Sequence, residues 1–182
     1  MRREIKNVLI CLEIDTLCKL TDPLDVQLKA IEEDVRNWDM KKYPDPDSCG
    51  VFDFAEALAG MGFVTCQWFL ATTHGWYQVD KPTALKLGPL HSSGLTFAEI
   101  INHAANYWKH HDEWPVGKKK KDAERIIEAF AKLGINQKDD YPLTNLLAEI
   151  NSKKETQFAP LIPLLEQWAK KISEISKRFR CT

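Results

Sequence analysis

Residues 96–114 hold three of the five histidines of this 182-residue chain, in the run TFAEIINHAANYWKHHDEW. Imidazole gains and loses a proton near neutral pH, so it can transfer protons, bind a metal ion or contact a phosphate. On residue type, His103 and His110 are the first candidates for such a role. They lie among two asparagines, a lysine and several carboxylates, which widens the chemistry that this stretch could support.

The spacing of these histidines disfavours a metal site. His103 and His110 are seven residues apart, or about 10 Å along a helix, so one ion could not bind both without ligands from another helix. The HExxH spacing is absent, as are a Gly-x-Ser-x-Gly elbow and a glycine loop for phosphate. A pair of Cys66 with His74 stays open, although the apolar surroundings of Cys66 favour an inert thiol. We expect no metal and no cofactor.

A second candidate feature is the run Lys118, Lys119, Lys120 and Lys121. Consecutive lysines suit contacts with the phosphates of nucleic acid, and His103 could add to them. A solvated helix start is the plainer explanation, but lysine there opposes the helix dipole, which favours a partner. The net charge of −1 argues against a protein built mainly to hold nucleic acid. Residues 92–182 nevertheless carry 15 Lys/Arg against 12 Asp/Glu.

The histidine stretch has a well-marked helix start and end. Thr96 and Glu99 form a capping box, and Leu95 with Ile100 can add a hydrophobic staple. Proline at 115 ends the helix near residue 114. At 100° per residue His111 falls on the apolar face. We expect water to reach one polar stripe: Glu99, Asn102, His103, Asn106, Lys109, His110 and Glu113.

Helical periodicity extends over most of the chain. We predict a single all-α domain, 1–182, built as an antiparallel bundle of six or seven helices. A long loop at about 75–95 joins two of them, with a helical turn or two at 82–87. No segment alternates as a strand would. Besides the histidine helix, the expected helices are 3–20, 21–42 (opened by Thr21, Asp22 and Pro23), 51–73, 122–133, 142–150 and 160–179.

The segment 51–73 is apolar on all sides, with no charged residue from Ala57 to Thr73. Such a helix is either a membrane span or the centre of a soluble bundle. Its uncharged run is shorter than the roughly 20 residues of a span, so we expect a central helix and no membrane. Gly60 and Gly62 predict a close approach of a neighbouring helix. Five scattered cysteines and an N-terminus unlike a signal peptide predict a cytoplasmic protein.

The helix order, with Asn106-Tyr-Trp-Lys109-His110 late in a bundle helix, resembles the HEPN-type helical proteins of bacterial toxin–antitoxin and phage-defence systems. Catalytic members of that group cleave RNA through an arginine followed four to six residues later by a histidine, usually across a dimer. No histidine here has an arginine at that spacing. The resemblance implies that Asn106, Lys109 and His110 are the RNA-contact or catalytic residues, His110 as general acid or base and Lys109 as stabiliser of the phosphorane.

Three functions remain open, and with them the question of whether the chain is an enzyme. The first is a HEPN-like binding or regulatory module directed at RNA or at a cognate protein, and paired as a homodimer. The second is an active endoribonuclease toxin that uses His110. The third is a protein-interaction domain without nucleic-acid contact, whose polar stripe is merely solvated.

Overall fold

The computed structural model describes residues 2–114, 121–136 and 139–178, and these fold entirely into helices and connections, as predicted. The two short 3₁₀ turns are η1 (His111–Glu113) and η2 (Ala159–Leu161). The α-helices are α1 (Arg2–Arg36), α2 (Val51–Tyr77), α3 (Lys81–Leu85), α4 (Phe97–His110), α5 (Lys121–Lys132), α6 (Pro142–Ile150) and α7 (Ile162–Arg178).

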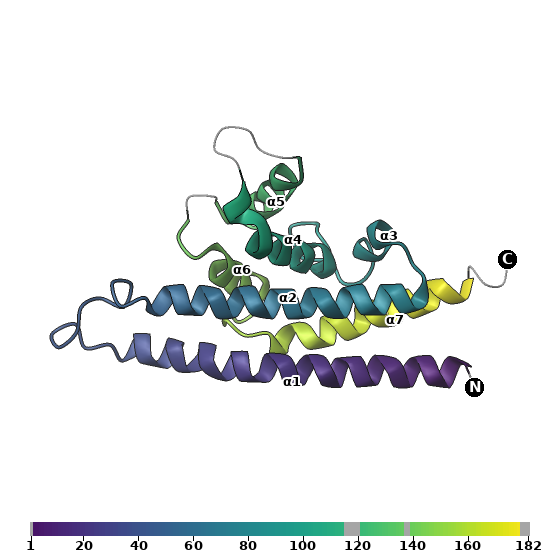
Figure 1. Ribbon diagram of the computed structural model, residues 1–182, viewed down its shortest axis with the longest axis horizontal. Coiled ribbons are helices and arrows are strands. Elements are labelled where there is room, and N and C mark those ends of the chain that lie inside the picture. The colour runs from purple at the N-terminus through teal and green to yellow at the C-terminus, as the bar shows by residue number, and fades with distance from the viewer. Residues whose placement is uncertain (1, 115–120, 137–138, 179–182) are drawn as a thin grey trace.

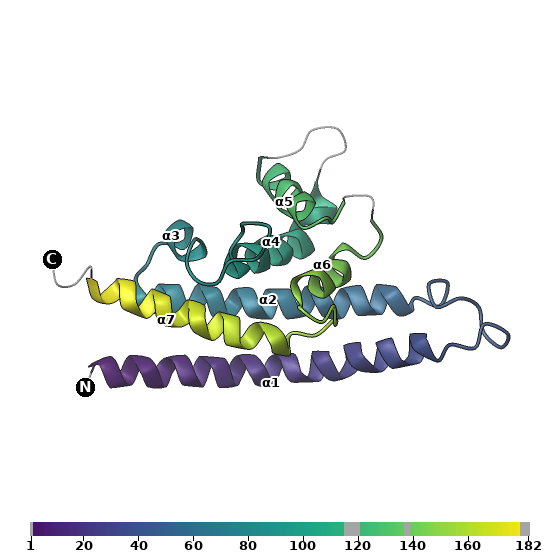
Figure 2. The same cartoon turned by 180° about the vertical axis from the view of Figure 1, so that it is seen from behind.

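The long helices α1 and α2 lie antiparallel, and α7 packs beside them (Figures 1 and 2). α4 lies on the other side of α2, and α5 packs against α4 (Figure 1). α2 contacts α1, α4, α6 and α7, so the prediction that it is the central helix is confirmed. In the described part of the chain, α2 is also the one helix long and apolar enough to cross a membrane. Half of its most apolar window is buried within the protein.

The predicted break in the first helix is wrong, because α1 runs through Pro23 without interruption. Thr21 is buried, and its hydroxyl donates to the carbonyl of Leu17 at 3.0 Å instead of capping a new helix. A proline inside a helix costs roughly 3 kcal/mol. Leu17 and Leu28, three turns apart on one face, are both fully buried, and this packing offsets the cost. The helix then ends at Arg36, earlier than predicted.

The connection between α2 and α4 is held against the bundle. α2 continues to Tyr77, and α3 forms where one or two turns were expected, capped by Asp80, which accepts the backbone N–H of Thr83 at 3.0 Å. The indole of Trp168 on α7 donates to the carbonyl of Ala84 at 2.8 Å. The connection is thereby fixed at the position from which α3 faces α4.

Carboxylates on the two long helices hold the starts of later helices. Glu56 of α2 accepts the backbone N–H groups of Leu143 and Thr144 in α6, both at 2.8 Å. Asp25 of α1 accepts those of Phe158 at 2.6 Å and Ala159 at 2.8 Å, just before α7. The first backbone donors of a helix lack partners within it, so these carboxylates serve as caps supplied from elsewhere in the chain. Burial raises the pKa of Asp25, and both backbone donors lower it.

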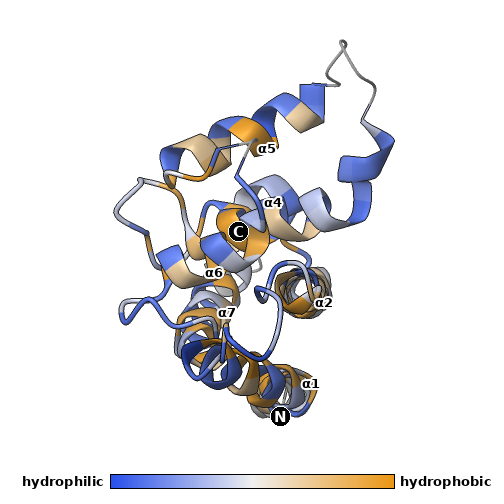
Figure 3. Ribbon diagram, turned by 90° about the vertical axis from the view of Figure 1, so that its left-hand side faces the viewer, coloured by the Kyte–Doolittle hydropathy of each residue, from blue (hydrophilic) through white to orange (hydrophobic). Residues whose placement is uncertain are grey.

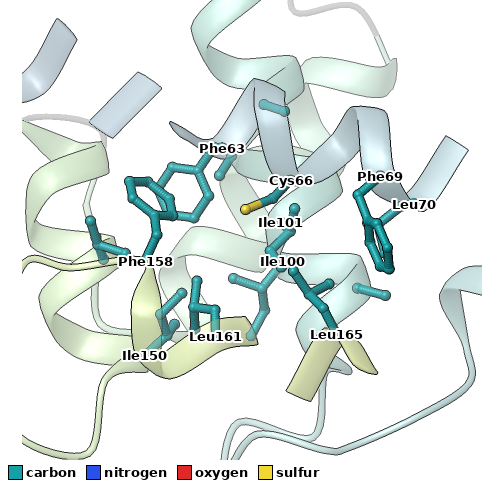
Figure 4. Close-up of a cluster of buried hydrophobic side chains, with 14 of the residues drawn as sticks. Phe63, Cys66, Phe69, Leu70, Ile100, Ile101, Ile150, Phe158, Leu161 and Leu165 are labelled. Carbon is teal, nitrogen blue, oxygen red and sulfur yellow. The ribbon is translucent and has the colours of Figure 1, made fainter. Parts of the chain in front are cut away.

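The core lies between α2, α4, α7 and η2 (Figure 4). Both glycines in the middle of α2 are sites of close approach, Gly60 to a neighbouring helix, as predicted, and Gly62 to the residue just before η2. A Cβ at Gly60 would lie 2.2 Å from the ring of Trp108, and one at Gly62 would lie 2.1 Å from the ring of Phe158. The two aromatic rings occupy the space that side chains would otherwise fill.

We predict that Gly62→Ala lowers the free energy of unfolding by about 1–3 kcal/mol, since overpacking outweighs the gain in helix propensity. Gly75→Ala is the matched control in the same helix, because nothing lies within 4 Å of a Cβ there. The control should raise stability by up to about 1 kcal/mol. Urea unfolding of both variants measures the difference, and equal effects would show that the contact with Phe158 is unimportant.

Candidate functional site

The start of α4 matches the predicted capping box. The Thr96 hydroxyl accepts the Glu99 backbone N–H at 3.0 Å, and the Glu99 carboxylate accepts the Thr96 backbone N–H at 3.0 Å. Glu99 also pairs with Lys86, which follows α3. α4 ends at His110, and η1 continues to Glu113. His111 turns towards the apolar side as expected, and its ring stacks on Tyr107 with centroids 4.7 Å apart.

The polar stripe of α4 lies on one surface but is not uniformly open to water. α3 and α5 flank it, and the three helices enclose a groove of about 690 Å³. Glu99 and Asn102 are buried, so the expectation that water reaches the whole stripe is wrong for these two. We call this hollow the α3–α5 groove. Its α4 wall consists of Glu99, Asn102, His103, Asn106, His110 and Glu113.

A smaller hollow of about 250 Å³ adjoins it between α2, α3 and α4. It shares Lys81, Leu85, Asn102 and Asn106 with the α3–α5 groove, so the two are continuous along α4. We call it the lysine pocket. Among the described residues no carboxylate lines it; its polar side chains are Gln67, His74, Lys81, Asn102, Asn106 and Lys109, and the rest of its described lining is apolar.

Gln67 of α2 organises the amides of the lysine pocket. Its side-chain N–H₂ donates to the Oδ1 atoms of Asn102 and Asn106, both at 3.0 Å. Its Oε1 accepts the ammonium of Lys109 at 2.7 Å. Because both asparagine oxygens turn towards Gln67, their N–H₂ groups are left as donors for a ligand.

The positive charges of the lysine pocket are not neutralised. Neither Lys81 nor Lys109 forms an ion pair within the described residues. Burial lowers the pKa of Lys109, and the charge of Lys81 lowers it further. The α3–α5 groove differs, since its Arg125 lies 3.5 Å from Asp122. An anion bound between these two ammonium groups would offset their mutual repulsion.

His103 lines the α3–α5 groove but not the lysine pocket. Its Nδ1 is shielded from solvent and has no hydrogen-bond partner in the described chain. Burial lowers its pKa; Glu99 opposes this shift, whereas Lys86, Lys81 and Arg125 add to it. The ring is therefore neutral at pH 7 and can offer one N–H and one lone pair.

The candidate catalytic residues do not converge on one point. Lys109 lines the lysine pocket, His110 lines the α3–α5 groove, and Asn106 lines both. His110 also lies 3.4 Å from Glu113. Of the predicted lysine run, Lys121 is exposed at the start of α5; Lys118, Lys119 and Lys120 fall outside the described residues.

Other chemistry finds little support in this arrangement. Cys66 is fully buried and burial raises its pKa, while Nδ1 of His74 contacts the carbonyl of Val79 at 3.0 Å. A reactive pair of Cys66 with His74 is therefore not formed. Among the described residues, no three His, Cys, Asp or Glu side chains are grouped to hold a metal ion.

Sequence reasoning missed Gln67 and Lys81. Gln67 had a detectable signal, because it is the only amide in the uncharged run of α2. Lys81 had none, since its place beside α4 depends on tertiary packing. Comparison of the chain with protein-family models, with curated proteins and with solved structures finds no match. The function is therefore argued from the geometry of the site.

We predict that the fold loses stability as the pH falls from 7 to 5, in part through His103. The unfolded chain takes up a proton near the ordinary histidine pKa of about 6.5, whereas the folded ring resists it, so acid favours unfolding. His103→Gln should reduce this loss. Urea midpoints at both pH values measure it, and an NMR titration of the imidazole checks the direction of the shift. If wild type and His103→Gln lost equal stability between pH 7 and pH 5, the contribution of His103 would be contradicted.

Proposed function

We propose that the chain is a HEPN-like RNA-binding module, regulatory in character and not itself a nuclease, which holds single-stranded RNA along α4. The observation that carries this proposal is the lysine pocket. Lys81 and Lys109 both line it, and among the described residues no carboxylate does. A phosphate placed there would neutralise both ammonium groups at once.

The surroundings of the two lysines suit a nucleotide better than a free anion. The N–H₂ groups of Asn102 and Asn106 can donate to the acceptor edges of bases, which single-stranded RNA exposes. The α3–α5 groove continues from the pocket and gives an extended ligand a path along α4. At about 690 Å³ it falls within the usual size of ligand sites. Lys121, exposed at the start of α5 next to Asp122 of the groove lining, adds a further positive charge nearby.

Binding is favoured over cleavage by the separation of the catalytic candidates. A ribonuclease needs its proton-transfer groups and its charge stabiliser around one phosphate. Here Lys109 and His110 line different hollows, and His110 faces Glu113. A role in toxin–antitoxin or phage-defence systems remains part of the proposal and rests on the resemblance of Asn106, Lys109 and His110.

We predict that the double variant Lys81→Gln, Lys109→Gln weakens binding of a labelled single-stranded RNA at least about tenfold, equivalent to 1.4 kcal/mol. The slope of log affinity against log salt should become shallower by about 0.7, since the two lysines share one phosphate and each lost phosphate contact on a single strand removes about 0.7. Fluorescence anisotropy at several salt concentrations measures both quantities.

The matched control is Lys19→Gln, Lys29→Gln, which removes the same charge from α1, a helix that lies on the other side of α2 from α4 (Figure 1). Equal weakening by both double variants would mean that net charge alone binds RNA, and would overturn the proposal. If the chain cleaved RNA and His110→Ala abolished that cleavage, the endoribonuclease toxin would replace the proposed binding module. If the chain bound a protein partner and showed no affinity for RNA, the third function, a protein-interaction domain, would be favoured.

A further inference from the structure

The inner wall of the α3–α5 groove presents amide donors. α4 lies between α2 and α5 when the molecule is viewed along α2 (Figure 3), and its polar residues form this wall. The side-chain oxygens of Asn102 and Asn106 both accept from Gln67. Their N–H₂ groups are therefore the parts of these side chains that remain for a ligand in the groove.

His103 adds a third donor to the same wall. Its Nδ1 is sealed from solvent without a hydrogen-bond partner in the described chain, so Nε2 is the ring nitrogen that can face the groove. The ring is neutral at pH 7, because burial lowers its pKa. A sealed N–H without a partner is rarer in proteins than a sealed acceptor without one. The single proton of the ring therefore belongs on Nε2, where it can be donated to a ligand.

The acceptors of the groove are either occupied or at its rim. One carboxylate oxygen of Glu99 pairs with Lys86, and the other accepts the backbone N–H of Thr96 at 3.0 Å. The other carboxylates of the described lining, Glu113 and Asp122, are 63% and 89% exposed and lie at the outer rim. A ligand in the groove thus meets donors at the inner wall and acceptors at the rim.

Guanine is the base whose edges match this division best. Its O6 and N7 are adjacent acceptors on one edge, and its N1–H and N2–H₂ are donors on the next. Adenine carries an amino group beside N7, so a donor of the base would face the donors of the wall. Uracil has an N–H between its two acceptors. Cytosine has adjacent acceptors in O2 and N3, but only one amino group for the two rim carboxylates.

Arg125 on α5 strengthens the match with guanine. It lines the same groove as His103, and its charge lowers the pKa of His103, so the two side chains face the same space. In the described chain its ion pair joins Nη1 to Asp122 at 3.5 Å, which leaves Nη2 and Nε for a ligand. A pair of arginine N–H groups on O6 and N7 is the commonest specific contact with guanine.

We propose that the α3–α5 groove recognises a guanine base of the bound RNA, next to a phosphate in the lysine pocket. This inference rests on the proposed function and adds base specificity to it. One nucleotide can reach both hollows, because they share Lys81, Leu85, Asn102 and Asn106. Apolar side chains of the groove cover the faces of the ring: Pro82, Leu85, Trp114, Ala123 and Ile126.

Fluorescence anisotropy with short labelled oligouridine strands tests the specificity. Each strand carries guanine, adenine, cytosine or uracil at its central position and is otherwise identical, so the phosphate contacts are the same. The guanine strand should bind the full chain at least about tenfold more tightly than the other three, since one good two-bond contact supplies this much discrimination.

Modified bases test which edge is read. 7-Deazaguanine has a C–H in place of N7, so it should lose most of the preference. Hypoxanthine keeps O6 and N7 but lacks the 2-amino group, so it should keep the larger part. The reverse order would place the recognised edge on the other side of the base and overturn the assignment of donors to the inner wall.

Arg125→Lys tests the arginine contact. Lysine keeps the charge but lacks the planar pair of N–H groups, so the ratio of the affinities for the guanine and uracil strands should fall about fivefold or more. The matched control is Arg36→Lys at the exposed end of α1, which should leave this ratio unchanged. Because both strands are measured with the same variant, a partial loss of folded protein cancels in the ratio.

The outcomes separate this inference from the proposed function. Equal binding of all four strands, with weaker binding by the Lys81→Gln, Lys109→Gln variant, would overturn guanine recognition and leave the RNA-binding module in place. Tightest binding of the cytosine strand would overturn the choice of base. An equal fall in the ratio for Arg125→Lys and Arg36→Lys would remove Arg125 from the site. Absence of binding to any strand would overturn both proposals.

Discussion

The fold depends on covering α2, a helix whose middle carries no charge and is apolar on nearly every side. Gly60 and Gly62 let Trp108 and Phe158 reach its backbone from two directions, which brings α4 and η2 into place. The one amide side chain in this run, Gln67, is half-buried beside α4 and needs hydrogen-bond partners there. α4 supplies them through its asparagines, since a buried amide without hydrogen bonds costs about 1–3 kcal/mol. The candidate site is therefore a consequence of how the central helix is packed.

Local signals in the sequence predicted local structure well. Thr96 with Glu99 marked the start of α4, and the expected ranges 122–133 and 142–150 lie within one residue of α5 and α6. Each signal acts through residues only a few positions apart, so no tertiary information was needed. Pro23 misled for the opposite reason: its local preference for a helix start was outweighed by packing on both sides of it, where Leu17, Thr21 and Leu28 of α1 are buried.

The candidate site was predictable in composition but not in environment. Helical spacing correctly placed His103, Asn106 and His110 on one surface, because that requires only the geometry of a single helix. It could not show that α3 and α5 enclose this surface. Nor could it show that Gln67 bonds to Asn102, 35 residues away, or that Glu56 caps a helix 87 residues later. Such contacts join segments that are distant in the sequence and share no sequence motif, so they become visible only in the packed structure.

The cap that Asp25 provides before α7 has a consequence for the newly made protein. Its backbone partner Phe158 follows 133 residues later. At about 5–20 residues per second, the ribosome needs roughly 7–27 s to make that interval. For this time α1 lacks the segment that completes its core, and α2, which ends at Tyr77, lacks it for the later part of the interval. The apolar faces of both helices are exposed meanwhile, which makes the growing chain a natural client for chaperones that bind hydrophobic surfaces.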